Sequence, residues 1–258
     1  MVRATRLAAA AAAIVAALLG GNALAAGEHV TPPKQDWPFS DVLFGKFDDA
    51  ALQRGLQVYL EVCASCHGLR LVAYRNLMDL GYSEEQVKVI AARFQVEDGP
   101  NDAGDMFERP GRPSDRFVSP FPNEQAARAA NGGALPPDLS LIAKAKLGGP
   151  DYIHAVLAGY TEPPAGFELG EGMHYNAYFH GHQIAMPAPL TPDRVTYADG
   201  TAATVEQMAW DVSNFLMWAA EPKLEERRKV GLKVLLFLIG LTAVLYIAKR
   251  RMWAGVAH

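Results

Sequence analysis

Two cysteines and a histidine are the residues of this sequence whose spacing could do chemistry. Cys63, Cys66 and His67 form a C-x-x-C-H motif, and the chain has no other cysteine. Thiols at this spacing can form two thioether bonds to the vinyl groups of a haem, and the adjacent imidazole can bind the iron. The motif therefore predicts one covalently bound haem c, with His67 as an axial ligand of the iron.

A C-x-x-C pair has two other common uses. A thiol–disulfide redox pair usually follows a strand in a βαβ unit, whereas a helix-like stretch precedes Cys63 here. A structural zinc site needs a second pair of ligands, and the chain offers no further cysteine. Both alternatives fit the sequence less well than covalent haem.

The sixth coordination position of the iron is open to several residues. A methionine ligand favours an electron carrier of high potential, whereas an open position would allow small ligands to bind. Pro187 follows Met186 and stiffens its loop, which suits a fixed thioether ligand. The spacing alone leaves the choice open. The candidates are Met106, Met173, Met186, His154, His174, His180 and His182.

Apolar segments near the two ends of the chain predict export and a membrane anchor. Residues 1–26 combine early arginines, an apolar stretch and a small-residue cleavage site, as a cleaved signal peptide does; an uncleaved anchor is the alternative. Residues 230–248 are almost wholly apolar, and as a helix of about 28 Å they could cross a bilayer rather than lie in a protein core. The expected parts are a signal peptide (1–26), an exported domain (27–222), and an anchor with a short cytoplasmic tail (223–258).

Charge is distributed unevenly along the chain. The formal net charge is −4, but residues 27–220 hold 25 acidic and 14 basic side chains, which gives this region a charge near −11. Such a domain repels nucleic acid and attracts basic partners. Charge of this kind also keeps a protein soluble, so it does not identify a partner by itself.

The remaining pattern predicts an all-α fold with long loops. Ser83 with Gln86, and Thr204 with Gln207, have the spacing of capping boxes at helix starts. Gly55 lies inside an expected helix, where it predicts a close crossing with the last helix of the domain. Residues 27–47 are expected to lie extended on the domain, and 95–122 and 160–203 to be loops. The expected helices of the domain cover 48–62, 83–94, 123–131, 151–159 and 205–220.

Several stretches of the sequence resemble the cytochrome c1 family. They are residues 54–59, 72–75, 98–107, 126–131, 133–140, 175–179 and 218–222. The similarity runs from about residue 30 to the C-terminus, and the stretches at 131–140 and 218–222 are specific to this family among c-type cytochromes.

The resemblance implies a fold and a function. The fold would be a cytochrome c-type haem domain with long loop insertions and one C-terminal transmembrane helix. The function would be transfer of single electrons, without catalysis by this subunit alone, from a Rieske iron–sulfur protein to a soluble basic c-type cytochrome. This takes place in a cytochrome bc1 complex that also contains cytochrome b. The haem domain would face the periplasm from a bacterial inner membrane. A haem subunit of a terminal oxidase or nitric oxide reductase, and a haem-based ligand sensor, are the alternatives.

The resemblance also selects residues for the site. It implies Met186 as the second axial ligand. Lys146 and Tyr152 match positions that face the haem propionates, although relatives often have arginine at position 146, and lysine offers a point charge in place of a planar fork. The contacts with the cofactor that it implies are Asn131, Pro136, Pro137, Lys146, Tyr152 and Phe179.

Overall fold

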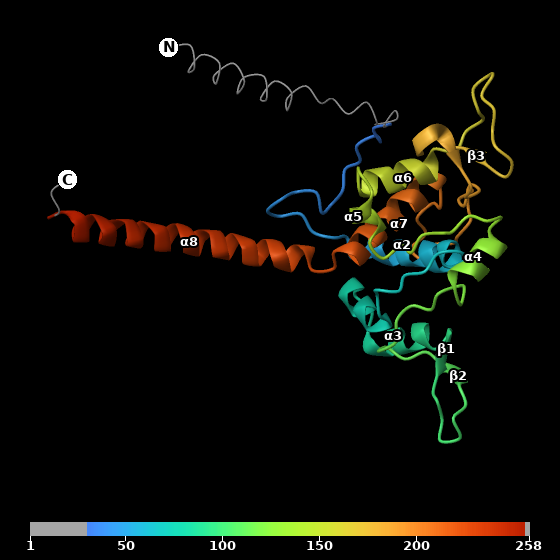
Figure 1. Cartoon of the computed structure of the whole chain (residues 1–258), viewed down its shortest axis with the longest axis horizontal. Helices are drawn as coiled ribbons and strands as arrows, with labels where there is room; N and C mark the ends of the chain where they lie inside the picture. Colours follow the sequence, from blue (N-terminus) through green and yellow to red (C-terminus); the bar gives the residue numbers. More distant parts are fainter. Residues whose placement is uncertain (1–29, 256–258) are drawn as a thin grey trace, which may run out of the picture.

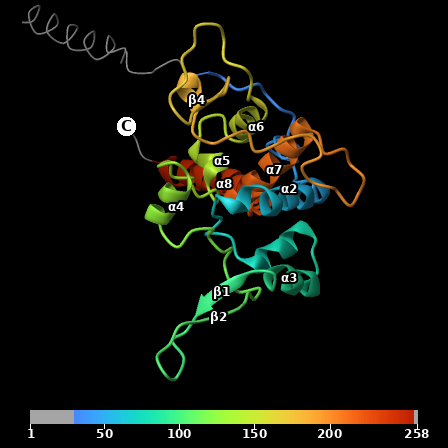
Figure 2. The ribbon, with the colours of Figure 1, turned by 90° about the vertical axis from the view of Figure 1, so that its right-hand side faces the viewer.

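Two helices from opposite ends of the domain cross at its centre in this computed structural model, which describes residues 30–255. Helix α2 (Asp49–Glu61) lies against helix α7 (Val205–Ala220), as Figures 1 and 2 show. A Cβ atom on Gly55 would lie 2.2 Å from the backbone oxygen of Asp211 and 2.6 Å from Cβ of Phe215. Only glycine permits this approach, so the predicted crossing at Gly55 is confirmed.

The other elements surround this pair of helices. The expected signal peptide, 1–26, lies outside the described residues. The predicted helices form within a few residues of their expected bounds, while α5 and the 3-10 helices η1, η2 and η3 were not expected. The predicted helices besides α2 and α7 are α3 (Glu84–Ala91), α4 (Glu124–Ala130), α6 (Pro150–Ala158) and α8 (Leu224–Trp253). The unexpected ones are η1 (Cys63–Ser65), η2 (Tyr74–Leu80), α5 (Ile142–Ala145) and η3 (His180–His182).

The two predicted capping boxes behave differently. At α3, the Ser83 hydroxyl accepts a hydrogen bond from the Gln86 N–H, and the Gln86 side chain accepts one from the Ser83 N–H. At α7, the Thr204 hydroxyl accepts a hydrogen bond from the Gln207 N–H. The Gln207 side chain instead donates to Asp211, so the second box is only half formed.

The main core fills the space between α2, α7 and the segment that follows η1. Arg54 of α2 donates hydrogen bonds to the fully buried Asp211 of α7, which neutralises the carboxylate at the edge of this core. The largest fully buried side chains are Leu52, Leu56, Val58, Tyr59, Leu69, Tyr74, Leu77, Leu80, Val87, Met208, Val212 and Phe215.

The segment 95–122 is more ordered than the sequence indicates. It contains an antiparallel hairpin of β1 (Gln95–Asp98) and β2 (Phe107–Pro110). The guanidinium of Arg109 holds the base of this hairpin by pairing with Asp98 and Asp115. Asn101 closes the turn by accepting hydrogen bonds from two backbone N–H groups. Polar side chains therefore supply the order that hydrophobic periodicity does not reveal.

The N-terminal segment lies extended on the domain, as predicted for its described part. The indole N–H of Trp37 donates a 2.7 Å hydrogen bond to the buried carboxylate of Asp151 on α6. The same indole stacks on Trp210 of α7, with ring centroids 5.9 Å apart. Trp37 and Phe39 are both buried, so this segment is part of the domain.

Helix α8 projects from the domain and extends beyond the apolar segment seen in the sequence (Figure 1). It begins at Leu224, six residues before residue 230. Within residues 30–255 it is the one helix long and apolar enough to cross a membrane, and the rest of the protein does not cover its apolar part. Glu221 joins the domain to this helix, because its carboxylate accepts hydrogen bonds from Lys144 and Arg227.

Candidate haem-binding site

The C-x-x-C-H motif forms a tight turn at the end of α2. The backbone N–H groups of Cys66 and His67 both donate to the carbonyl oxygen of Cys63, at 3.1 and 2.9 Å. Both cysteines are partly buried, and they form no disulfide with each other. Burial raises the pKa of the Cys63 thiol to about 12, with Cys66 adding to the effect. A thiol–disulfide enzyme needs a lowered thiol pKa, so this environment disfavours that alternative.

His67 is oriented by a backbone carbonyl. Its Nδ1 lies 2.8 Å from the carbonyl oxygen of Pro137, so Nδ1–H donates this bond and Nε2 is left to bind a metal. Burial lowers the pKa of His67, against smaller opposing effects of Pro137 and Asp138, and this favours the neutral ring that ligation requires. Two thiols and one imidazole with a free Nε2 are the donor set that a covalently attached haem needs.

A set of hydrogen bonds, here called the clasp, joins residues 67–71 to residues 137–140. Besides the bond from His67 to Pro137, the Leu139 N–H donates to the Gly68 oxygen at 2.8 Å. The side chain of Asp138 accepts from the Arg70 N–H at 3.0 Å, and the hydroxyl of Ser140 accepts from the Leu71 N–H at 3.1 Å. The clasp fixes the imidazole relative to the motif turn.

Asp138 and Ser140 are site residues that the sequence analysis did not select. The other oxygen of Asp138 accepts a 3.0 Å hydrogen bond from the Ser140 N–H, which is an Asx turn. The Asp-x-Ser pattern directly after Pro137 is a signal from which this turn could have been predicted. Its connection to Arg70 and Leu71 is long-range and is visible only in the structure.

Met186 follows a short pair of strands, β3 (His174–Tyr175) and β4 (Gln183–Ile184). The Tyr160 hydroxyl donates a 3.0 Å hydrogen bond to the carbonyl oxygen of Met186. Ile184 is buried, and Met186 itself is partly buried. The backbone of this methionine is therefore held on both sides, by the strand pair and by Tyr160.

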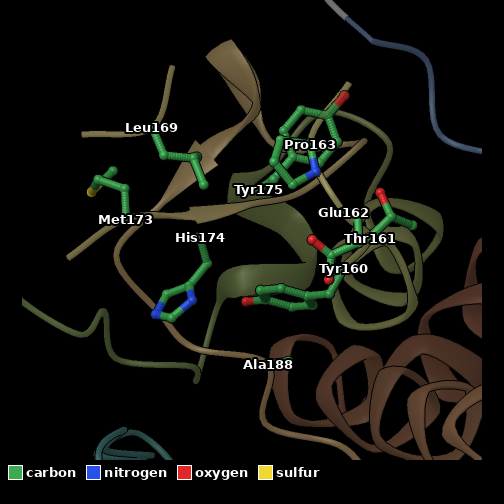
Figure 3. Close-up of a pocket in the computed structure, with 9 residues that line it drawn as sticks. All are labelled: Tyr160, Thr161, Glu162, Pro163, Leu169, Met173, His174, Tyr175 and Ala188. Carbon is green, nitrogen blue, oxygen red and sulfur yellow. The ribbon is translucent and has the colours of Figure 1, made fainter. Parts of the chain in front are cut away.

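The rival candidates have other surroundings. Met106 is 55% exposed and lies beside the turn of the β1–β2 hairpin, which projects away from α2 in both Figures 1 and 2. Met173 and His174 line an open pocket together with Tyr160 (Figure 3). His154 is buried with its Nε2 3.1 Å from a Glu206 carboxylate oxygen. The lining residues of the pocket come from 160–188 and include none of the motif residues.

The two remaining candidates are His182, whose imidazole has partners of its own, and His180. The His182 ring stacks on the ring of Tyr175, with centroids 5.6 Å apart, and its Nδ1 lies 3.3 Å from the Asn176 carbonyl oxygen. His180 is exposed on η3. Met186 thus combines partial burial with a fixed backbone, which suits an axial ligand better than the surroundings of these histidines do.

The other residues selected by resemblance come from separate elements. The Asn131 side chain donates to the Ala127 oxygen at the end of α4, at 2.7 Å. Phe179 is tied to the loop that precedes Met186, because its N–H donates to the Asn176 side chain. Lys146 is exposed at the end of α5. Tyr152 is half-buried on α6, and burial raises its pKa.

Comparison with models of protein families shows to which family the chain belongs. The model of the cytochrome c1 family matches residues 37–256, which is most of the chain. The chain belongs to the cytochrome c1 family. Its fold is therefore that of this family, its cofactor is a covalently bound haem c, and it takes part in electron transport.

Individual relatives agree with this assignment. A Rhodospirillum rubrum protein named cytochrome c1 is 50% identical over 256 residues, which cover 93% of this chain and 94% of that protein. A Candida albicans protein named cytochrome b-c1 complex catalytic subunit, mitochondrial, is 48% identical over 92% of this chain and 83% of its own length. A Bradyrhizobium diazoefficiens protein named cytochrome b/c1 is 54% identical over 86% of this chain, but the matched part spans 36% of that protein.

Proposed function

We propose that this protein is the single-electron carrier of a cytochrome bc1 complex, anchored in the membrane by α8. It would accept electrons from a Rieske iron–sulfur protein and deliver them to a soluble c-type cytochrome. When bound, haem c supplies a one-electron couple whose potential the protein can tune. The single observation that carries the proposal is the 2.8 Å hydrogen bond from Nδ1–H of His67 to the carbonyl oxygen of Pro137. It orients the imidazole of the C-x-x-C-H motif in a member of the cytochrome c1 family.

Each residue of the site would have one task. Cys63 and Cys66 would bind the cofactor covalently, and His67 would bind the iron through Nε2, held by the clasp. Met186 would be the second iron ligand, and its thioether would raise the reduction potential. Haem contacts from Asn131, Pro136, Pro137, Lys146, Tyr152 and Phe179 belong to the same proposal.

The names of two relatives support assembly with cytochrome b. The Candida albicans protein is named as a subunit of a cytochrome b-c1 complex, and the Bradyrhizobium diazoefficiens protein carries both cytochromes in its name. This chain spans 36% of the latter, which leaves room for a second protein in that polypeptide. We infer that cytochrome b lies next to α8 in the bilayer.

The proposed orientation places residues 27–222 in the periplasm and the C-terminus in the cytoplasm. It follows from the expected signal peptide and from the basic residues after the apolar segment, Lys249, Arg250 and Arg251. The charge near −11 of residues 27–220 would then attract a basic soluble cytochrome.

Purification in mild detergent through a tag on this chain tests the proposal. We expect b-type haems and a Rieske signal to accompany the c-type haem in the reduced-minus-oxidised spectrum and in electron paramagnetic resonance. Arrival of the c-type haem with oxidase haems and copper would instead indicate a terminal oxidase. A c-type haem that arrives alone and binds carbon monoxide at its sixth position would indicate a ligand sensor.

A further inference from the structure

Three consecutive apolar side chains stand exposed on a loop near the start of α8. Val42, Leu43 and Phe44, here called the apolar tip, are 74%, 59% and 79% exposed. A contiguous apolar group of this kind is unusual on a water-facing surface and marks a place where something else covers it.

The loop that carries the apolar tip is held in one shape. One carboxylate oxygen of Asp41 accepts hydrogen bonds from the N–H groups of Leu43 and Phe44, at 2.8 and 2.7 Å, which is an Asx turn. A Cβ atom on Gly45 would lie 2.5 Å from the Asp41 carbonyl oxygen, so the chain returns tightly after the tip. The apolar side chains are thus presented outward by a closed turn.

The same loop is bound to the first turns of α8. The guanidinium of Arg228 donates hydrogen bonds to the carbonyl oxygens of Phe39 and Asp41, both at 2.8 Å. The Phe47 N–H donates to Glu225 at 3.0 Å. In Figure 1 the loop, drawn in blue, reaches along α8 toward the C-terminal end of that helix. The apolar tip therefore has a fixed height along the anchor.

That height coincides with the surface of the membrane that α8 spans. Arg228 precedes the apolar residues 230–248 by two positions, which is about 3 Å along a helix axis. The headgroup region of a bilayer is roughly 5–7 Å deep on each side of the hydrocarbon. An arginine and an aromatic ring at this level are typical of segments that lie at a membrane interface.

We propose that the apolar tip inserts into the boundary between headgroups and acyl chains of the lipid bilayer, beside α8. The tip and the helix then hold the domain at two points and set its tilt on the membrane. The inference rests on the membrane anchor and is independent of the proposed electron transfer, because its readout does not involve the haem.

A spin label on Leu43→Cys, in the full chain within its complex in lipid bilayers, tests the insertion. The thiols of the motif would be bonded to the haem, so within this chain the label reports only position 43, and the labelled parent complex gives the background from other subunits. Val42→Cys gives a second reading. Ala165→Cys is the control, because Ala165 is exposed and belongs to the loop between α6 and β3. That loop lies at the end of the domain away from α8 (Figure 1). The unchanged haem spectrum of each variant confirms that it folds.

We expect oxygen to collide with the labels at 42 and 43 at least several-fold more often, relative to a water-soluble nickel chelate, than with the label at 165. Equal ratios at 43 and 165 would place the apolar tip in water and overturn the proposal. Low accessibility of the label at 43 to both reagents would also overturn it, because another protein subunit would then cover the tip.

Discussion

Nδ1 of His67 lies 2.8 Å from the carbonyl oxygen of Pro137, although 70 residues separate them in the chain. A ring nitrogen held in this way determines which tautomer is present and where the other nitrogen points. The carbonyl is in turn held by the hydrogen bonds of Asp138 and Ser140, so the orientation of the proposed iron ligand depends on a distant segment of the chain.

Replacement of Asp138 by alanine should loosen this arrangement. Asp138→Ala removes the acceptor for the Arg70 and Ser140 N–H groups, which should cost about 1–3 kcal/mol in the free energy of unfolding. The haem should stay attached, but its reduction potential should shift because His67 is held less firmly. Denaturant titration and redox titration measure the two effects. Asp138→Asn, which retains an acceptor oxygen, should lie closer to the parent protein in both, and equal losses in the two variants would contradict a role through hydrogen bonding.

Met186→Leu should remove the second axial ligand while preserving apolar packing. We expect loss of the near-infrared band of a methionine–iron bond and a large fall in the reduction potential. Met173→Leu and Met106→Leu are matched controls, because Met173 lines the open pocket of Figure 3 and Met106 is 55% exposed, and neither should change the spectrum. An unaltered band in Met186→Leu would remove this residue from the site.

Gly55→Ala tests the central crossing. The added Cβ would come within 2.2 Å of backbone on α7, so the helices must separate, and the cost should be about 1–3 kcal/mol or more in the free energy of unfolding. Thermal denaturation followed at the haem band reports it. Gly231→Ala on α8, where no neighbouring atom lies within 4 Å of the added Cβ, should leave the melting temperature nearly unchanged. A similar small effect at both sites would mean that the crossing is looser than described.

Low pH should destabilise the β1–β2 hairpin. Hydrogen bonds from Arg109 lower the pKa of Asp98 and of Asp115 below the ordinary value of 3.8. A lowered pKa in the folded state stabilises the fold above pH 3.8, and this stabilisation is lost as the pH falls through the folded-state pKa values. The protection factors of the hairpin amides, which are corrected for the slower intrinsic exchange in acid, should therefore fall below about pH 4. In Arg109→Gln the exchange should already be fast at neutral pH and should show no such step; persistence of the step would assign it to other carboxylates.

The acidic domain should speed its reaction with a basic soluble cytochrome at low salt. Stopped-flow rates should fall as ionic strength rises, because exposed charges are screened over about 10 Å at 0.1 M salt. A neutral small-molecule oxidant provides the control, and its rate should vary little. Equal salt dependence for the two oxidants would argue against electrostatic steering.

Local features of this protein were readable from the sequence, whereas long-range polar contacts were not. The helix that begins after Asp48, the box at Ser83 and the crossing at Gly55 each follow from a few neighbouring residues, and all three are present. The hairpin at 95–110 depends on Arg109 reaching both Asp98 and Asp115, which no periodicity reveals. The half-formed box at Thr204 fails for the same reason, because Asp211 competes for the Gln207 side chain.

The candidate site shows the same difference between local features, which the sequence predicts, and long-range contacts, which it does not. The motif at Cys63 to His67 predicts a haem attachment from five adjacent residues. The second axial ligand could not be predicted from spacing, because seven residues, three methionines and four histidines, were compatible with it, and the resemblance to a family selected Met186. The structure holds the backbone of Met186 in place through Tyr160, a contact between residues 26 positions apart.

The junction between the domain and α8 fixes the position of the domain relative to the helix. Leu224, the first residue of the helix, is buried beside Trp37 and Phe39, and Glu221 joins α5 to the first turn of α8 through Lys144 and Arg227. A junction packed in this way has no free hinge, so we expect the domain to keep one position relative to α8. Under the proposed function, electron transfer would then depend on the movement of the partners, and the rate of turnover should respond to the diffusion of the soluble acceptor.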